Sequence, residues 1–336
     1  MKYRHFWAAL AAFSLLSLNA WAAPKKSAKS AAPATPYEAA VQKLSDKDPS
    51  VRRQGADALG EMRNPEAAPA LIRVLTDVSP QVRSSAVDAL GVMRFQCAGA
   101  VIAKMLETDK DATVRQTAAI ALGYMGNRAL ISSLLKGLDD PHDGTRFASV
   151  NSLGILRDPS TSKALAEKLK DPDPRMRKSA SYALSRLQDK SAVPALLESL
   201  KQSRSTETAL NGQPKGDATV AASMLRSLGE MGDKAMIPKV KPFMEDPDPS
   251  VRIAAAHSLY LLGDSTGLPM ARKFLKDKNS GSRKMAVDIL GHMGAPSDLA
   301  ALRGMGDDPD PQVKESLKSA IQFLSPRPAS PKKQKR

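Results

Sequence analysis

The chain has 336 residues, and its 42% hydrophobic and 25% charged residues are ordinary for a folded protein and exclude wholesale disorder. Aromatic residues make up only 4%, which argues against an all-β sandwich, whose strands are rich in aromatic and β-branched residues. A single cysteine excludes an internal disulfide framework, and the formal net charge of +15 bears on partners but not on the fold.

The first 22 residues have the parts of a secretory signal peptide. Lys2 and Arg4 precede an apolar run over residues 6–18, and residues 20–22 form the small-x-small pattern Ala-Trp-Ala. The run of 13 residues is shorter than the roughly 20 that span a bilayer, which disfavours an uncleaved anchor. We therefore expect cleavage after Ala22 and an exported, periplasmic or secreted, mature chain without a transmembrane segment.

Basic tails flank the part of the chain that we expect to fold. Residues 23–36 contain three lysines, residues 325–336 contain five basic residues, and neither segment contains an acidic residue. Both lack apolar side chains to bury, which predicts a disordered linker and a disordered tail. Their charge suggests an anionic surface, such as lipid, cell-wall polymer or polysaccharide, as an alternative partner.

A unit of about 31 residues repeats between the tails. Val-Arg or a close variant recurs every 31 or 32 residues, apart from one larger interval, and typically precedes Ala-x-x-Ala-Leu-Gly-x-Met. Apolar residues in this segment recur at three- and four-residue steps, which predicts an amphipathic first helix. The recurrent arginines, here called the arginine ladder, are Arg52, Arg83, Arg115, Arg146, Arg177, Arg252 and Arg283.

Each unit continues with a turn and a second apolar run, as in residues 69–75, which predicts a second helix. Asp-Pro pairs stand between units, for example in residues 171–174 and 246–249. Aspartate is a good N-cap, and proline is tolerated in the first helical turn because its missing N–H would have no partner there. No such unit can bury its apolar face alone, so neighbouring units are expected to stack.

The interval between Arg177 and Arg252 exceeds two periods by 13 residues. We place the surplus in an inserted loop over residues 201–216. Ala221 then takes the position of the ladder arginine in the following unit, and the chain contains nine first helices.

The register of these Val-Arg, Ala-Leu-Gly and Asp-Pro elements resembles HEAT repeats, in particular the short HEAT-like repeats of phycobilisome-lyase-type proteins, over residues 37–324. The resemblance implies an all-α, right-handed α-solenoid with first helices on the convex side and second helices on the concave side. It also implies that each ladder arginine is structural and pairs with an aspartate of the inter-repeat turn, such as Asp48, Asp173 or Asp248. Tyr37–Leu44 is then an orphan second helix that caps the start.

An exposed column of the second helices gives a candidate binding ridge. Its first member, Arg73, points away from the apolar Leu71 and Leu75 and hence toward solvent. The full ridge is Arg73, Lys104, Lys136, Glu167, Glu198, Lys273 and Arg303. Its basic ends predict a concave groove for an anionic or mixed-charge protein, although any solvated helix face carries such charges. The ridge has no aromatic stacking platform, so nucleic acid is not expected.

No pattern of catalytic, cofactor-binding or metal-binding residues emerges. The histidines after residue 22 lie in separate units without the spacing of a zinc site. Residues 263–267 match Gly-x-Ser-x-Gly, but that nucleophile motif needs a strand-to-helix turn, and here a helix-to-helix turn is predicted. A column of methionine and leucine, beginning with Met62, favours core packing. Cys97 is expected to be a buried, unreactive thiol.

These features together predict an exported, non-enzymatic scaffold that binds a protein of the cell envelope and needs no cofactor. Two alternatives stay open. One is a basic envelope protein that binds an anionic surface, and the other is a lyase-like accessory subunit, which only the family resemblance suggests.

Overall fold

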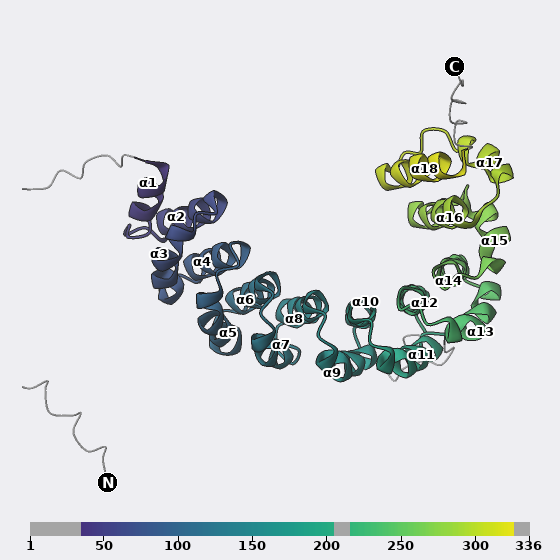
Figure 1. Cartoon of the computed structure of the whole chain (residues 1–336). Helices are drawn as coiled ribbons and strands as arrows, with labels where there is room; N and C mark the ends of the chain where they lie inside the picture. The colour runs from purple at the N-terminus through teal and green to yellow at the C-terminus, as the bar shows by residue number, and fades with distance from the viewer. Residues whose placement is uncertain (1–34, 205–215, 326–336) are drawn as a thin grey trace, which may run out of the picture.

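The two-helix pattern folds into a curved row of helices in the computed structural model, which describes residues 35–204 and 216–325 (Figure 1). Within these ranges the chain forms eighteen α-helices, short 3-10 helices and no strand. Figure 1 shows the helices stacked in chain order into an open arc. The predicted all-α solenoid is therefore confirmed.

In the part of the chain that the structure describes, nine first helices begin at or next to the Val-Arg pattern, as predicted. Aspartates of the inter-repeat turns cap several of them; Asp48, for example, accepts a hydrogen bond from the backbone N–H of Ser50 at 2.8 Å. Such a cap satisfies one of the backbone donors that have no partner at a helix start. The first helices are α2 (Pro49–Met62), α4 (Pro80–Val92), α6 (Ala112–Met125), α8 (Asp143–Leu156), α10 (Pro174–Leu187), α12 (Ala218–Glu230), α14 (Pro249–Leu261), α16 (Ser280–Met293) and α18 (Pro311–Leu324).

The second helices are shorter, and most follow a 3-10 turn. The orphan helix α1 (Pro36–Lys43) begins one residue before its predicted range, with Thr35 as its cap. The others are α3 (Ala68–Arg73), α5 (Gly99–Thr108), α7 (Ile131–Gly137), α9 (Ser162–Glu167), α11 (Val193–Gln202), α13 (Ile237–Val240), α15 (Leu268–Phe274) and α17 (Leu299–Arg303). The 3-10 helices are η1 (Pro65–Ala67), η2 (Val74–Thr76), η3 (Gln96–Ala98), η4 (Arg128–Leu130), η5 (Pro159–Thr161), η6 (Lys168–Lys170), η7 (Lys190–Ala192), η8 (Lys234–Met236), η9 (Lys241–Glu245), η10 (Ser265–Gly267) and η11 (Pro296–Asp298).

The first helices line the inner, concave side of the arc, and the second helices form its outer side (Figure 1). The predicted assignment of the two layers is therefore wrong. The physical reason is a column of glycines where successive first helices touch. A Cβ atom on Gly91 would lie 2.6 Å from the Cβ of Ala121, and one on Gly123 would lie 2.5 Å from the Oγ of Ser152. Small residues let the first helices approach closely, so the row bends toward them.

The core lies between the two layers. The first helices contribute a leucine from each unit, such as Leu59, Leu90 and Leu122, and all three are fully buried. Second helices contribute equally buried side chains, such as Leu71 and Ile102. Because each apolar side chain lies between neighbouring units, stacking supplies the burial that a single unit cannot.

The core divides into two clusters at α14. One cluster extends from α1 to α14 and the other from α14 to α18. In α14, Tyr260 occupies the position that glycine has in most first helices, and α14 and α16 pack less closely than the other neighbouring first helices. The Tyr260 ring lies 5.5 Å from that of His257 and 5.6 Å from that of His292, measured between ring centroids. A bulky ring thus separates two helices that glycine would allow to touch.

Parts of the predicted domain organisation fall outside the described residues. These parts are the signal peptide at residues 1–22, most of both basic tails, and residues 205–215 of the inserted loop. The loop begins later than predicted, because α11 continues through Lys201 to Gln202. Across the described ranges, none of the helices is both long and apolar enough to span a membrane.

Candidate functional site

The predicted binding ridge lies on the wrong side of the arc. Its residues are solvent-exposed, as expected, but they belong to the second helices on the convex side (Figure 1). Two of them pair with neighbours: Lys136 with Glu107 at 2.8 Å, and Glu167 with Lys170 at 3.1 Å. The residues whose predicted concave position is wrong are Arg73, Lys104, Lys136, Glu167, Glu198, Lys273 and Arg303. They cannot line the concave surface, because the glycine contacts place the first helices there.

The arginine ladder is structural, but its aspartate partners differ from those predicted. Four arginines form two-pronged ion pairs with an aspartate in the next inter-repeat turn, at 2.6–3.0 Å. These pairs are Arg52–Asp77, Arg83–Asp109, Arg115–Asp140 and Arg283–Asp308. The predicted partners Asp48, Asp173 and Asp248 instead cap their own helices.

Each of these arginines also holds the turn before its own helix. The Nη1 atom of Arg83 donates to the backbone carbonyl of Asp77 at 2.8 Å, while its other nitrogens hold Asp109. One guanidinium therefore joins two consecutive inter-repeat turns. The hydrogen bond from Arg52 holds the pKa of Asp77 below its ordinary value, which is the expected effect of a cation on a carboxylate.

The remaining ladder arginines keep the backbone contact. The Nη1 atoms of Arg146, Arg177 and Arg252 donate to carbonyls of the preceding turn at 2.8, 2.8 and 2.7 Å. Where the ladder has Ala221 in place of arginine, Arg204 at the base of the insertion supplies a guanidinium. Its Nε and Nη2 atoms donate to Asp246, both at 2.7 Å. The insertion thus provides an ion pair that its own unit lacks.

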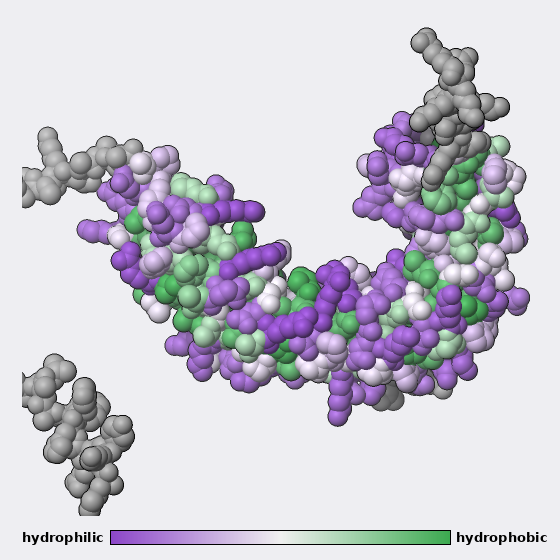
Figure 2. Space-filling model, in the orientation of Figure 1, coloured by the Kyte–Doolittle hydropathy of each residue, from purple (hydrophilic) through white to green (hydrophobic). Residues whose placement is uncertain are grey.

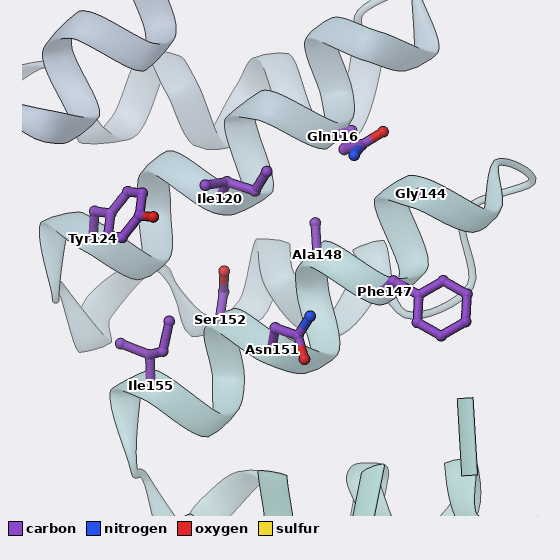
Figure 3. Close-up of a pocket in the computed structure, with 9 residues that line it drawn as sticks. All are labelled: Gln116, Ile120, Tyr124, Gly144, Phe147, Ala148, Asn151, Ser152 and Ile155. Atoms are coloured by element: carbon purple, nitrogen blue, oxygen red, sulfur yellow. The ribbon is translucent and has the colours of Figure 1, made fainter. Parts of the chain in front are cut away.

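The concave surface carries an apolar region over α6 and α8. A groove of about 330 Å³ between these helices is lined by Ile120 and Tyr124 on one side and by Phe147, Asn151 and Ile155 on the other (Figure 3). Figure 2 shows apolar surface at the middle of the inner side, bordered by hydrophilic surface. The groove therefore opens toward the inside of the arc.

Large apolar side chains are exposed in this region. The exposed fractions are 48% for Tyr124, 44% for Ile155 and 52% for Tyr182 of α10. We call Ile120, Tyr124, Phe147, Ile155 and Tyr182 the inner patch. Its side chains stand one, five or nine positions after a ladder arginine, on the helix face opposite the core. The predicted second-helix ridge missed this column, although the repeat register of the first helices marks it in the sequence.

Carboxylates gather on the amino-terminal side of the inner patch. Asp57 and Glu61 of α2 and Asp88 of α4 line a groove of about 510 Å³, together with Arg63. Arg53 lies beside them, with its Nη1 atom 3.7 Å from Asp57. Burial, assisted by the charge of Asp57, raises the pKa of Asp88. We call Asp57, Glu61 and Asp88 the acidic end of the inner surface.

Cations gather on the other side of the patch. Lys178 and Arg186 lie on α10, and Arg226 is exposed on α12, where Glu230 is the neighbouring carboxylate. The Arg186 guanidinium lies 5.7 Å from the centre of the Tyr182 ring, and its Nε donates to the carbonyl of Gly154 at 3.1 Å. We call Lys178, Arg186 and Arg226 the basic end.

In the described ranges, no three His, Cys, Asp or Glu side chains are grouped so that they could hold a metal ion. Ser265 of the Gly-x-Ser-x-Gly match lies in η10, in a helix-to-helix turn, as predicted. One smaller prediction is wrong: Cys97 is exposed because it sits at a turn in η3. The methionine and leucine column packs in the core at Met125, Leu156, Leu187, Met231 and Leu262, as predicted, whereas Met62, at the end of α2, is 40% exposed.

Comparison with known proteins gives a family. A model of HEAT repeats matches residues 37–98, 99–169, 156–211, 206–270 and 261–322. No curated protein matches the chain in sequence.

Among solved structures, the chain is similar to YibA of Escherichia coli, with 18% identity, a TM-score of 0.47 and coverage of 85% of this chain and 90% of that one. An engineered protein shows 19% identity, a TM-score of 0.46 and coverage of 86% and 88%. The CpcE–CpcF complex of phycocyanin lyase from a Nostoc species shows 23% identity, a TM-score of 0.33 and coverage of 90% and 99%. Because the HEAT-repeat model matches nearly all of the folded region, the chain belongs to the HEAT-repeat family.

Proposed function

We propose that this protein is a non-enzymatic scaffold that binds a protein partner on the concave surface of its solenoid. The observation that carries the proposal is the inner patch. Tyr124 and Ile155 are exposed along the groove between α6 and α8, and Tyr182 is exposed on α10, the next first helix. Soluble proteins seldom expose adjoining apolar side chains on a large scale unless a partner covers them. Stacked repeats provide the extended concave surface that such a partner needs.

The proposed partner belongs to the cell envelope. The support is the sequence of residues 1–22, whose basic start, apolar run and Ala-Trp-Ala pattern favour export and cleavage after Ala22. The basic tails support a second role, attachment to an anionic surface, because they concentrate eight positive charges without a carboxylate. The lyase-like alternative rests on the resemblance alone and is not part of this proposal.

The test is capture of a partner from envelope extract by immobilised mature chain, followed by cross-linking and mass spectrometry. A triple variant, Tyr124→Ala, Ile155→Ala and Tyr182→Ala, should lose at least about tenfold in capture, because central aromatic contacts dominate protein interfaces. The matched control changes three exposed residues of the outer side: Arg73→Ala, Lys104→Ala and Lys136→Ala. This control should capture the partner as well as the unmodified chain does.

Circular dichroism would first establish that both triple variants keep their helix content. Capture that survives the inner-patch changes, or that disappears with the outer changes, would refute binding on the concave surface. Attachment to an anionic surface is tested separately, by cosedimentation with anionic vesicles at low salt. The variant for this test is a chain that lacks residues 326–336. Loss of cosedimentation without loss of partner capture would assign the tail to surface attachment.

A further inference from the structure

The three regions of the inner surface follow one another along the arc. The acidic end lies on α2 and α4, the inner patch on α6, α8 and α10, and the basic end on α10 and α12. Each region is built by neighbouring first helices, and the first helices line the concave side of the arc (Figure 1). A single segment of a partner that follows the inside of the arc would therefore meet them in this order.

The acidic end has an excess of negative charge. Three carboxylates, Asp57, Glu61 and Asp88, share one groove with the guanidinium of Arg63, and Arg53 is the other cation beside them. The raised pKa of Asp88 reflects its burial first and the nearby charge of Asp57 second. A cation of the ligand placed here would stabilise the ionised form of Asp88 against both its burial and the charge of Asp57, because an opposite charge favours the ionised carboxylate.

The basic end has the opposite excess. At the inner positions of α10 and α12 the charged side chains are Lys178, Arg186, Arg226 and Glu230. Arg175 of α10, which is paired with Asp173, also lies 5.5 Å from the centre of the Phe147 ring. Arg186 is held by the Gly154 carbonyl and by Tyr182, whose hydroxyl lies 3.3 Å from its Nη1 atom. A cation fixed beside an aromatic ring is suited to a carboxylate that follows an apolar side chain.

The spacing limits the length of the bound segment. Packed helices lie about 8–10 Å apart, so three steps from α4 to α10 amount to roughly 25–30 Å. An extended chain covers that distance with about eight residues, at about 3.3–3.6 Å for each. The groove between α6 and α8 lies between the two charged ends and can admit one bulky apolar side chain.

From these observations we infer that the bound part of the partner is an extended peptide segment with segregated charge. Lys or Arg residues of the segment lie over α2 and α4, an aromatic or branched aliphatic residue enters the groove between α6 and α8, and Asp or Glu residues lie over α10 and α12. Opposite charges at the two ends fix the placement of the segment, and the apolar centre supplies most of the affinity. This inference rests on the proposed binding function of the concave surface.

The experiment uses a phage-displayed library of random peptides of about 16 residues, selected on the immobilised mature chain. Enriched peptides should carry basic and acidic residues on opposite sides of an apolar residue. The variant Glu61→Lys/Asp88→Lys should stop selecting basic residues and keep the acidic side. The variant Lys178→Glu/Arg226→Glu should do the reverse. Arg186 is left unchanged because it also holds α8.

A synthetic peptide from the selection provides the quantitative test. Each charge-reversed variant should weaken its binding about tenfold at low salt, and the difference should shrink in 1 M salt, where the Debye length is only about 3 Å. A matched control on the outer side, Lys104→Glu/Lys273→Glu, should leave binding unchanged. No enrichment, enrichment without charge segregation, or equal binding by both variants and the unmodified chain would overturn the inference.

Other occupants of the surface are distinguished by two further measurements. If sedimentation shows a dimer that the inner-patch variant abolishes, a second copy of the chain is the occupant and the inference falls. If removing residues 326–336 strengthens peptide binding tenfold or more, the basic tail occupies the acidic end and the inference also falls. Partner capture that depends on the inner patch but not on either charged end would leave the proposed function intact.

Discussion

At the scale of single residues, the ladder arginines show how one side chain connects two repeats. Arg83 holds the carbonyl of Asp77 before its helix and the carboxylate of Asp109 one repeat later. Burial raises the pKa of Asp109, but its hydrogen bonds with Arg83 and the backbone outweigh burial and keep the pKa below its ordinary value. The stabilisation from this pair is therefore present above about pH 4, the unfolded value, and is lost as the pH falls further.

We predict that Arg83→Ala lowers the free energy of unfolding at pH 7 by about 1–3 kcal/mol, because a partly buried carboxylate loses its charged partner. The matched control is Arg53→Ala in the preceding first helix. Its ion pair with Asp57 spans 3.7 Å between side chains that are 50% and 43% exposed, so the loss should stay below about 1 kcal/mol. Urea denaturation followed by circular dichroism measures both values, and equal losses would contradict a connecting role for Arg83.

At the scale of helices, the bounds of the elements could be read from the sequence, but their layer could not. Apolar periodicity, capping aspartates and helix-starting prolines are local signals, and they predicted the first helices and the orphan helix within one or two residues. The glycine that most first helices share was also visible in the sequence. The packing contact of this glycine was not visible in the sequence, because Gly91 meets Ala121 in the next repeat.

We predict that Gly91→Val destabilises the chain by about 1–3 kcal/mol and straightens the arc between α4 and α6, because the new side chain would overlap Ala121. Small-angle scattering should show a larger radius of gyration, and thermal denaturation a lower midpoint. Ala100→Val adds a comparable side chain at an exposed position of α5 and serves as the control. An unchanged scattering profile for Gly91→Val would show that the glycine column does not set the curvature.

At the scale of the whole molecule, the solenoid contains two cores joined at α14. His257 lies at this junction, and its Nδ1 atom is buried without a hydrogen-bond partner among the described residues. Burial lowers the pKa of His257 to about 4; Asp288 opposes the shift, and Arg226 and Lys284 add to it. A histidine in an unfolded chain titrates near pH 6.5. Between about pH 4 and about pH 6.5, His257 binds a proton in the unfolded chain but not in the folded one. The free energy of unfolding of the junction therefore falls as the pH falls.

We predict that acid opens the carboxy-terminal core before the rest of the solenoid. At pH 5, amide hydrogens of α16 and α18 should exchange roughly tenfold faster in the unmodified chain than in His257→Leu. At pH 7.5 the two proteins should exchange alike, apart from the small packing effect of the substitution. His142→Leu, at an exposed position before α8, is the control and should show no such pH dependence. The same difference at both pH values would exclude titration of His257 as the cause.

The inner patch and its charged ends belong to this largest scale as well. The sequence contains Tyr124, Ile155 and Tyr182 at regular positions, but a column of exposed residues becomes a binding surface only when its layer is known to face inward. The second-helix ridge looked equally suitable, because its residues are exposed and charged. The curvature excludes it, and that curvature arises from contacts between residues about 30 positions apart.

The sequence by itself determined the helices, their order, the repeat register and the HEAT-repeat family, because periodicity, caps and turns act within a few residues. Only the tertiary structure decided which helices face the concave side, which aspartate each ladder arginine holds, and that Arg204 substitutes at the position of Ala221. Those outcomes depend on the packing of one repeat against the next, where side-chain size and distance, rather than local pattern, select the contact.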